Sequence, residues 1–346
     1  RGLGDVYKRQ LIRLLTGVLA VQDFDSVITG DDSLKKRPMD RIIEPLTSCG
    51  AKIKSNEYKA PLSIYGSSSV NPIEYNQDVA SAQVKSCLIL SALYISGQST
   101  FYEEIQTRDH TENLLEHLSY EINRDSNSLS LKGKQNLIAK DIFIGSDISS
   151  AAFFIVASLI VDGSCIEMRN VNINESRTGI VTVLKGMGAD IEISDIKKVS
   201  NELLGNIRVR HSKLKCADIK GEIIPSLIDE LPILFIACAC ASGISKISGI
   251  EELRYKESDR IMAMENGLRA IGINVHSSKD SIEITGGKIT GGKVNSYDDH
   301  RIAMSFAIAG LISKHSLTIK DTKNISTSFP SFVTILRELG VEVFEV

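Results

Sequence analysis

The chain has 346 residues, enough for about two domains of ~100 to 200 residues each, so a large core and an enclosed site are feasible. Its 40 Lys and Arg residues against 43 Asp and Glu leave a formal net charge of −3, which excludes a general nucleic-acid binder and makes any basic site local. The six cysteines form no CxxC pair and the longest apolar stretch, residues 231–244, is too short to cross a bilayer, so we expect a cytoplasmic protein with reduced thiols and no membrane partner.

Five segments are apolar on nearly every face, a pattern that predicts helices buried on all sides. In chain order they are residues 11–20, 86–96, 149–161, 231–241 and 300–312. Most are followed by a turn and a stretch rich in β-formers. Buried helices flanked by strands favour an α/β fold in which sheets wrap a helical bundle.

Five further segments run from an amphipathic helix into a short strand, at residues 49–53, 119–122, 187–191, 271–275 and 339–343. Their last apolar residues are separated by 69, 69, 84 and 68 positions, a step typical of a repeated supersecondary unit. Ser258 and Ser331 are the predicted N-caps of two of the helices. Four of the helices should end at a glycine in a left-handed cap, namely Gly50, Gly188, Gly272 and Gly340.

Each repeat therefore reads strand, buried helix, strand, amphipathic helix, strand, strand, and the sequence holds about five such βαβαββ units. A turn near residues 134–138 divides them into two and three. We expect residues 11–135 to form one part and residues 136–346 the other.

Charged residues are concentrated in loops that precede helices, at residues 31–38, 107–111, 226–232, 254–260 and 298–301. A helix N-terminus favours anions, and converging guanidinium groups suit a small ligand with several phosphate or carboxylate groups. Each cluster taken alone is also compatible with ordinary helix caps and solvated loops.

Two of these clusters exceed what capping requires. Asp229 lies at the mouth of an otherwise apolar helix, where an unpaired carboxylate would be costly, so it should have a cationic partner. The run RYKESDR at residues 254–260 holds three cations and two carboxylates. Its Lys256 and Glu257 could transfer protons if burial shifts a pKa.

Other chemistries have little support in the sequence. No GxxxxGK[ST] phosphate loop and no GxGxxG turn is present. His110 and His117 lack a third ligand nearby, so we expect no metal site.

The charged loops, taken in chain order, resemble those of the enolpyruvyl transferase family, and within it those of the 5-enolpyruvylshikimate-3-phosphate synthases. The resemblance runs from about Leu11 to the C-terminus and is carried by RLLTGVLA, KKRPMDRIIEPL, SAQVKS, TRDHTENLL, GSDISSAAFFIVASLI, SRTGIVTVLKGMGADI, LIDELPIL, ELRYKESDRI, DDHRIAM and STSFPSF. It implies two globular halves, each of three βαβαββ units around buried helices. Five of the six units would be present here.

The resemblance also implies a reaction: transfer of the enolpyruvyl group from phosphoenolpyruvate to the 5-hydroxyl of shikimate 3-phosphate, with release of phosphate, in aromatic amino acid biosynthesis. No metal or organic cofactor is implied, and a full-length enzyme would be a monomer. Matching positions assign shikimate 3-phosphate to Ser81, Gln83 and Arg108. They assign phosphoenolpyruvate to Arg37, Arg260 and Arg301.

The remaining roles that the resemblance implies concern proton transfer. Asp229 would accept the proton of the 5-hydroxyl, Lys256 would lie beside the substrates, and Glu257 would exchange a proton at the methylene carbon. Arg13 matches a family arginine and receives a supporting role. For each residue the alternative is a structural ion pair or a cap.

The match has two departures. Residues 1–10, RGLGDVYKRQ, match nothing in the family, so we expect them to be non-native and outside the fold. An N-terminal unit with a Lys-Ser pair and an arginine is not found ahead of Leu11. This leaves a catalytically inactive truncated fragment as an alternative function.

Three relatives or scaffolds are further alternatives. A UDP-N-acetylglucosamine enolpyruvyl transferase is the nearest, but that relative has a cysteine in the loop corresponding to residues 31–38, and this loop has none. RNA 3′-terminal phosphate cyclase shares the unit architecture but not the SAQVKS and RYKESDR blocks. A non-enzymatic repeat scaffold would leave the charged loops unexplained.

Overall fold

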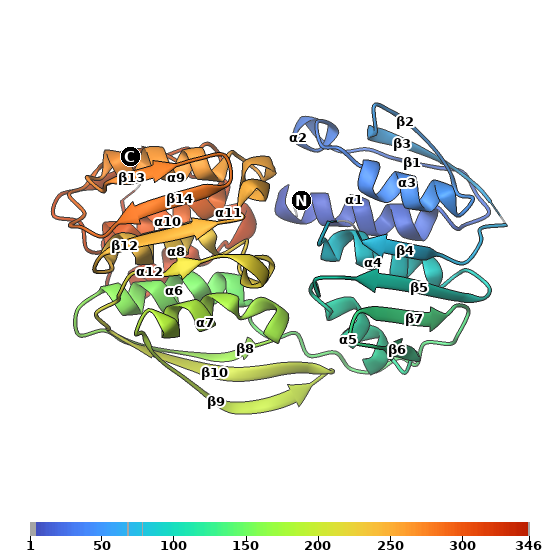
Figure 1. Ribbon diagram of the computed structural model, residues 1–346, viewed down its shortest axis with the longest axis horizontal. Coiled ribbons are helices and arrows are strands. Elements are labelled where there is room, and N and C mark those ends of the chain that lie inside the picture. Colours follow the sequence, from blue (N-terminus) through green and yellow to red (C-terminus); the bar gives the residue numbers. More distant parts are fainter. Residues whose placement is uncertain (1–4, 68, 78, 345–346) are drawn as a thin grey trace. The chain divides into compact units, whose positions relative to one another are not determined.

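A computed structural model describes residues 5–67, 69–77 and 79–344 of the chain. The chain divides between Phe143 and Ile144 into two compact units, here called unit 1 (residues 1–143) and unit 2 (residues 144–346). The loop that follows residue 135 is bonded to unit 1, because Ile138 N donates to Leu118 O at 2.8 Å. The expected α/β class is confirmed in both units (Figure 1).

Unit 1 holds two small sheets and the helices that cover them (Figure 1). Its helices are α1 (Asp5–Leu19), α2 (Asp32–Lys35), α3 (Asp40–Ser48), α4 (Ala82–Ala92) and α5 (His110–His117). Its strands are β1 (Ser26–Ile28), β2 (Lys52–Asn56), β3 (Lys59–Tyr65), β4 (Glu74–Gln77), β5 (Gln98–Glu103), β6 (Ile122–Arg124) and β7 (Ser128–Lys132). The sheets have the orders β1-β3-β2 and β4-β5-β7-β6.

Unit 2 holds three sheets around a core of helices (Figure 1). Its helices are α6 (Ile148–Ile160), α7 (Gly179–Gly186), α8 (Leu231–Cys240), α9 (Arg260–Ala270), α10 (His300–Gly310), α11 (Ile325–Ser328) and α12 (Phe332–Glu338), with 3-10 turns η1 (Glu175–Arg177), η2 (Gly221–Ser226) and η3 (Glu251–Tyr255). Its strands are β8 (Cys165–Asn172), β9 (Asp190–Val199), β10 (Glu202–Arg210), β11 (Asp218–Ile219), β12 (Ile244–Ser248), β13 (Val275–Ser277), β14 (Ser281–Thr285), β15 (Gly292–Asn295) and β16 (Leu317–Lys320).

The sheets confirm the repeated unit. In unit 1, β4 pairs parallel with β5, which pairs antiparallel with β7, and β7 with β6. In unit 2, the order β11-β12-β14-β13 has the same sequence of parallel and antiparallel pairs. Both four-stranded sheets therefore come from a complete βαβαββ unit. The sheets β1-β3-β2 and β8-β10-β9 correspond to the last three strands of such a unit, and β15-β16 to the first two.

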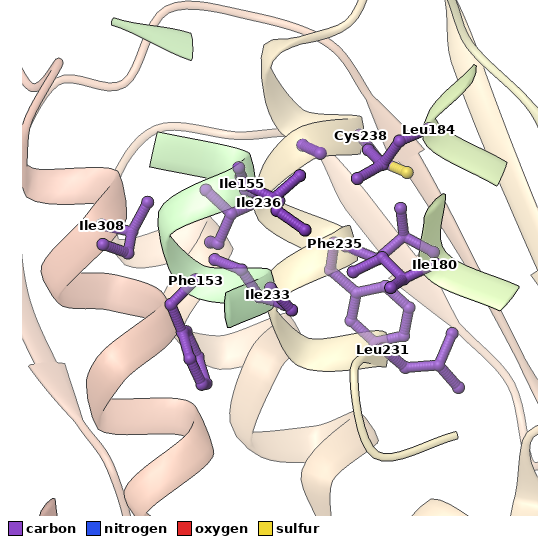
Figure 2. Packing of buried hydrophobic residues seen from close by; sticks show 14 of the residues in the cluster. Phe153, Ile155, Ile180, Leu184, Leu231, Ile233, Phe235, Ile236, Cys238 and Ile308 are labelled. Carbon is purple, nitrogen blue, oxygen red and sulfur yellow. The ribbon is translucent and has the colours of Figure 1, made fainter. Parts of the chain in front are cut away.

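The core of unit 2 consists of α6, α8 and α10, which pack against one another. Phe153 and Ile155 of α6, Phe235 and Ile236 of α8 and Ile308 of α10 meet in this core (Figure 2). Helix α8 is buried on nearly every face, as its apolar sequence predicts. Packing in the core sets the positions of these three helices, and charged loops lie at their N-termini.

Two helix predictions need correction. Helix α1 is not buried all round, because Leu11 is 50% exposed and Leu15 is 39% exposed. The helix also begins at Asp5, so the part of residues 1–10 that the structure describes is helical rather than outside the fold. Residues 1–4 lie outside the described residues.

The predicted helix ends are confirmed at all four glycines: Gly50, Gly188, Gly272 and Gly340 have φ of 103°, 94°, 89° and 88°. Ser331 occupies the predicted N-cap position of α12, but its side chain makes no capping hydrogen bond. The predicted cap Ser258 is wrong by one residue, because the Asp259 carboxylate accepts from Met262 N at 3.0 Å.

The predicted strand at residues 339–343 is also wrong. Residues 341–344 form no strand. Instead, Val341 N donates to Leu336 O at 3.0 Å, and Val343 O accepts from Arg337 Nη2 at 3.0 Å. The segment is thus bonded back to α12, without a sheet partner among the described residues.

Candidate active site

The charged cluster of unit 2 lies at the N-termini of α8, α9 and α10. Asp229 and Glu230 precede α8, and Lys256 and Glu257 lie just before α9, which begins at Arg260. Asp299 caps α10 by accepting from Arg301 N at 2.9 Å. Helix N-termini carry partial positive charge, so three of them beside several cations make a local site for anions.

Asp229 is at the centre of this cluster. Its Oδ1 lies 3.9 Å from both Lys256 Nζ and Arg260 Nη1. Its backbone oxygen accepts from Arg301 Nη1 at 2.8 Å. The prediction that this carboxylate has a cationic partner is confirmed, and the side chain keeps 18% exposure, which lets a ligand reach it.

Arg260 is a buried cation, with a side chain only 1% exposed. Its Nε donates to Asp299 Oδ2 at 2.8 Å and its Nη2 to Glu257. Burial lowers the pKa of the guanidinium, but Asp299 and Glu257 outweigh burial and raise that pKa above its usual range. Its Nη1 is buried and has no hydrogen-bond acceptor among the described residues, so one donor of this guanidinium is left unsatisfied beside Asp229.

Lys256 is held from a second side. Its Nζ donates to Glu252 Oε1 at 2.7 Å, and the side chain is largely buried. The sequence predicts that Lys256 and Glu257 can transfer protons, and in the structure Lys256 lies beside Glu252 and Asp229 while Glu257 lies beside Arg260. Neighbours in sequence thus serve different partners.

The loop that carries Lys256 and Glu257 is braced by Arg254. Its Nη1 donates to Asp259 Oδ2 at 2.7 Å and its Nε to Lys279 O at 2.7 Å. These bonds tie the loop to the helix cap of α9 and to the turn between β13 and β14. The site residues therefore sit on a backbone that is fixed at both ends.

The other predicted site residues belong to unit 1. Ser81 is the N-cap residue of α4, and Gln83, in the first turn, accepts from Arg13 Nη1 at 2.9 Å. This contact brings Arg13 and Gln83 together. Arg37 follows α2, and Arg108 lies in the loop between β5 and α5.

Lys85 is a residue of unit 1 to which the sequence interpretation gave no role. It is 2% exposed, and its Nζ lies 2.9 Å from Glu103 Oε2 and 2.7 Å from Glu112 Oε1. It also donates to Thr107 O at 3.4 Å. Lys85 thereby fixes both ends of the loop that carries Arg108. A lysine within the apolar segment VKSCLIL was the available signal.

The described part of the chain contains neither a metal-binding cluster nor a helix that could span a membrane. Among residues 5–67, 69–77 and 79–344, no three His, Cys, Asp or Glu side chains are grouped so that they could hold a metal ion. No helix in this part of the chain has the length and apolar character that a membrane span requires.

Comparisons with known proteins identify the family and the relatives of this chain. The model of the family described as EPSP synthase (3-phosphoshikimate 1-carboxyvinyltransferase) matches residues 10–336. The 3-phosphoshikimate 1-carboxyvinyltransferase of Coxiella burnetii (strain CbuK_Q154) is 49% identical over 96% of this chain and 76% of the relative. That of Legionella pneumophila (strain Paris) is 46% identical over 96% of this chain and 77% of the relative.

Solved structures of enolpyruvyl transferases also match this chain. An EPSP synthase from Acinetobacter baumannii has a TM-score of 0.86 and 42% identity, over 95% of this chain and 76% of that one. The enolpyruvyl transferase NikO from Streptomyces tendae has a TM-score of 0.75 at 13% identity, over 96% of this chain and 76% of that one, and shares the fold. The matched range and the identity to these relatives place the chain in the EPSP synthase family.

Proposed function

We propose that this protein transfers the enolpyruvyl group of phosphoenolpyruvate to the 5-hydroxyl of shikimate 3-phosphate and releases phosphate. The observation that carries the proposal is the position of the Asp229 carboxylate between Lys256 and Arg260, with Arg301 bonded to its backbone. A base flanked by cations suits a reaction in which a hydroxyl attacks a doubly acidic substrate. The name of the relatives, 3-phosphoshikimate 1-carboxyvinyltransferase, supports 3-phosphoshikimate as the acceptor and a carboxyvinyl group as the group transferred.

Each step of the proposed reaction can be assigned to a residue. The 5-hydroxyl oxygen adds to C2 of phosphoenolpyruvate while its proton passes to Asp229, and the methylene carbon takes a proton from Glu257. In the tetrahedral intermediate, the bond from C2 to the phosphate oxygen breaks. Glu257 removes a proton from the new methyl group to restore the double bond, and the proton held by Asp229 leaves with phosphate.

The cations in this scheme hold anions and stabilise developing charge. Arg260 and Arg301 would take the phosphate or carboxylate of phosphoenolpyruvate, as would Arg37 of unit 1. Lys256 would lie beside both substrates. Ser81, Gln83 and Arg108 would hold shikimate 3-phosphate, and Arg13 would support Gln83, whose Oε1 it contacts.

We also propose that the enzyme acts in the cytoplasm on these two small molecules, without nucleic-acid or membrane partners, and that it works as a monomer. Its near-zero net charge of −3 supports the absence of a nucleic-acid partner. Light scattering on the purified protein during gel filtration would report one chain per particle, and a stable dimer would contradict the monomer.

A phosphate-release assay tests the function. With both substrates present, the purified chain should release phosphate continuously, and with either substrate omitted it should release none. Replacing shikimate 3-phosphate by UDP-N-acetylglucosamine should also abolish release, which separates the two enolpyruvyl transferases. Binding of both substrates in calorimetry without phosphate release would favour the inactive-fragment alternative instead.

A further inference from the structure

A buried polar network lies behind Arg301 in unit 2, and the proposed reaction uses none of its other members. Its centre is Glu230, whose side chain is completely buried. Glu230 Oε1 lies 3.8 Å from Arg177 Nη2 and 3.8 Å from Arg301 Nη1. The Ser149 hydroxyl donates to the same oxygen.

The far side of the network is fixed by Arg177. Its Nη2 donates to Ser149 Oγ at 2.5 Å and to Asp147 Oδ1 at 3.2 Å. Asp147 is the N-cap of α6, and Ser149 lies in the first turn of that helix. Glu230 is therefore attached on one side to the rigid N-terminus of α6 and faces the site residue Arg301 on the other.

The charge of Glu230 is not needed for packing. Helix α8, which follows it, is built from apolar residues and is buried throughout its first two turns. A buried carboxylate is unfavourable unless cations and hydrogen bonds compensate it. Because the Glu230 charge lies between the guanidinium groups of Arg177 and Arg301, it points to a role other than stabilising the fold.

Arg301 is held differently from Arg260. Asp299 and Glu257 both accept hydrogen bonds from Arg260, whereas Glu230 stays 3.8 Å from Arg301, beyond hydrogen-bond distance. The Arg301 side chain donates to Asp229 O through Nη1, and no described residue accepts from its Nε or Nη2. Glu230 thus attracts the guanidinium without occupying the donors that an anion needs.

We propose that Glu230 is a positioning residue that, with Ser149 and Arg177, orients the Arg301 guanidinium so that its remaining donors meet an anionic group of phosphoenolpyruvate. The inference deepens the proposed function and rests on it. Loss of the Glu230 charge should therefore weaken the binding of phosphoenolpyruvate more than it slows the chemical step.

The test is Glu230→Gln, which keeps the shape and an oxygen for the Ser149 hydroxyl but removes the charge. The KM for phosphoenolpyruvate should rise about tenfold, with kcat and the KM for shikimate 3-phosphate changed less than about twofold. Glu222→Gln is the matched control, because it makes the same substitution at an exposed position of η2. Its constants should equal those of the wild type.

A double-variant comparison separates positioning from general loss of structure. If Glu230 acts through Arg301, the increase in KM caused by Glu230→Gln should disappear in an Arg301→Lys background, because coupled residues are not additive. The same increase in both backgrounds, or a wild-type KM in Glu230→Gln, overturns the inference. Glu230→Asp, which keeps the charge, should recover part of the affinity.

A third readout separates this inference from the proposed function. If the wild type releases no phosphate from the two substrates, the proposed function fails, and calorimetry with phosphoenolpyruvate alone decides the inference. Glu230→Gln should then bind this probe about tenfold more weakly than Glu222→Gln. Equal affinities, or no binding by the wild type, overturn it.

Discussion

His300 is a buried histidine between Asp299 and Arg301 at the start of α10. Burial, followed by the charge of Arg301, lowers the pKa of its imidazole to about 4, with Arg260 adding to this effect and Asp299 and Glu257 opposing it. In the unfolded chain a histidine titrates near 6.5. Proton binding therefore favours the unfolded chain below that pH, and the stability that neutral His300 provides above pH 6.5 is lost as pH falls towards 4.

We expect the free energy of unfolding to fall by up to about 3 kcal/mol between pH 6.5 and 4 because of this residue. Urea unfolding at a series of pH values measures the change. His300→Gln should flatten this part of the curve, whereas His276→Gln, at an exposed position, should not. Parallel curves for wild type and His300→Gln would contradict the assignment.

Single residues also show what the sequence could and could not predict about the site. The charge pattern indicated Asp229 and its need for a partner, because a carboxylate at the mouth of an apolar helix is locally recognisable. It gave no role to Glu230 or Asp299, whose partners Ser149 and Arg260 lie 81 and 39 residues away in the chain. In the sequence, a carboxylate that becomes buried cannot be distinguished from one that stays solvated, because the residues that surround it come from distant parts of the chain.

At the scale of elements, Lys85 joins α4, β5 and α5 through Glu103 and Glu112. Burial raises the pKa of the Glu112 carboxyl, and the Lys85 charge opposes that rise. Removing the ammonium would leave two carboxylates without compensation, which is the costly way to break a buried ion pair.

Lys85→Met should therefore lower the free energy of unfolding by about 3–5 kcal/mol, measured by denaturant titration. Adding Glu112→Gln should restore part of the loss, because one uncompensated charge is removed. Lys35→Met, which breaks the exposed pair with Asp32 at 3.5 Å, should cost less than about 1 kcal/mol. A similar loss in both lysine variants would show that the burial of Lys85 carries no extra stability.

Elements differ in how well local sequence predicts them. The helix ends at Gly50 and Gly188 were predictable, because a left-handed cap depends on one residue. The strand expected at residues 339–343 was not formed, because a strand exists only where another strand pairs with it, and α12 binds this segment instead. Helix α1 was predicted as fully buried from its composition, which does not specify which neighbours cover it.

At the scale of the whole molecule, the buried residues form two separate apolar clusters, one in each unit. Phe235, one of the α8 side chains labelled in Figure 2, lies in the cluster of unit 2, and Leu88 lies in that of unit 1. The near-constant spacing of the repeats predicted the βαβαββ element from the sequence, because each repeat is a local stretch of chain. The pairing of residues from different repeats required the structure.

Separate cores should respond separately to substitution. Phe235→Ala should destabilise unit 2 by about 3–5 kcal/mol and increase amide hydrogen exchange in α8 and α10, while α4 keeps its protection. Leu88→Ala should give the reverse pattern. Mass-spectrometric hydrogen exchange measures both, and equal loss of protection in the two units after either substitution would contradict independent cores.

The account depends most on Asp229 as the base beside Lys256 and Arg260, and Asp229→Asn tests it most directly. The coupled phosphate-release assay should give a kcat lower than that of the wild type by roughly 10²–10⁴-fold, with phosphoenolpyruvate still bound in calorimetry. Asp218→Asn, at an exposed position of β11, should retain the wild-type kcat. Turnover by Asp229→Asn at the wild-type rate would contradict the central claim.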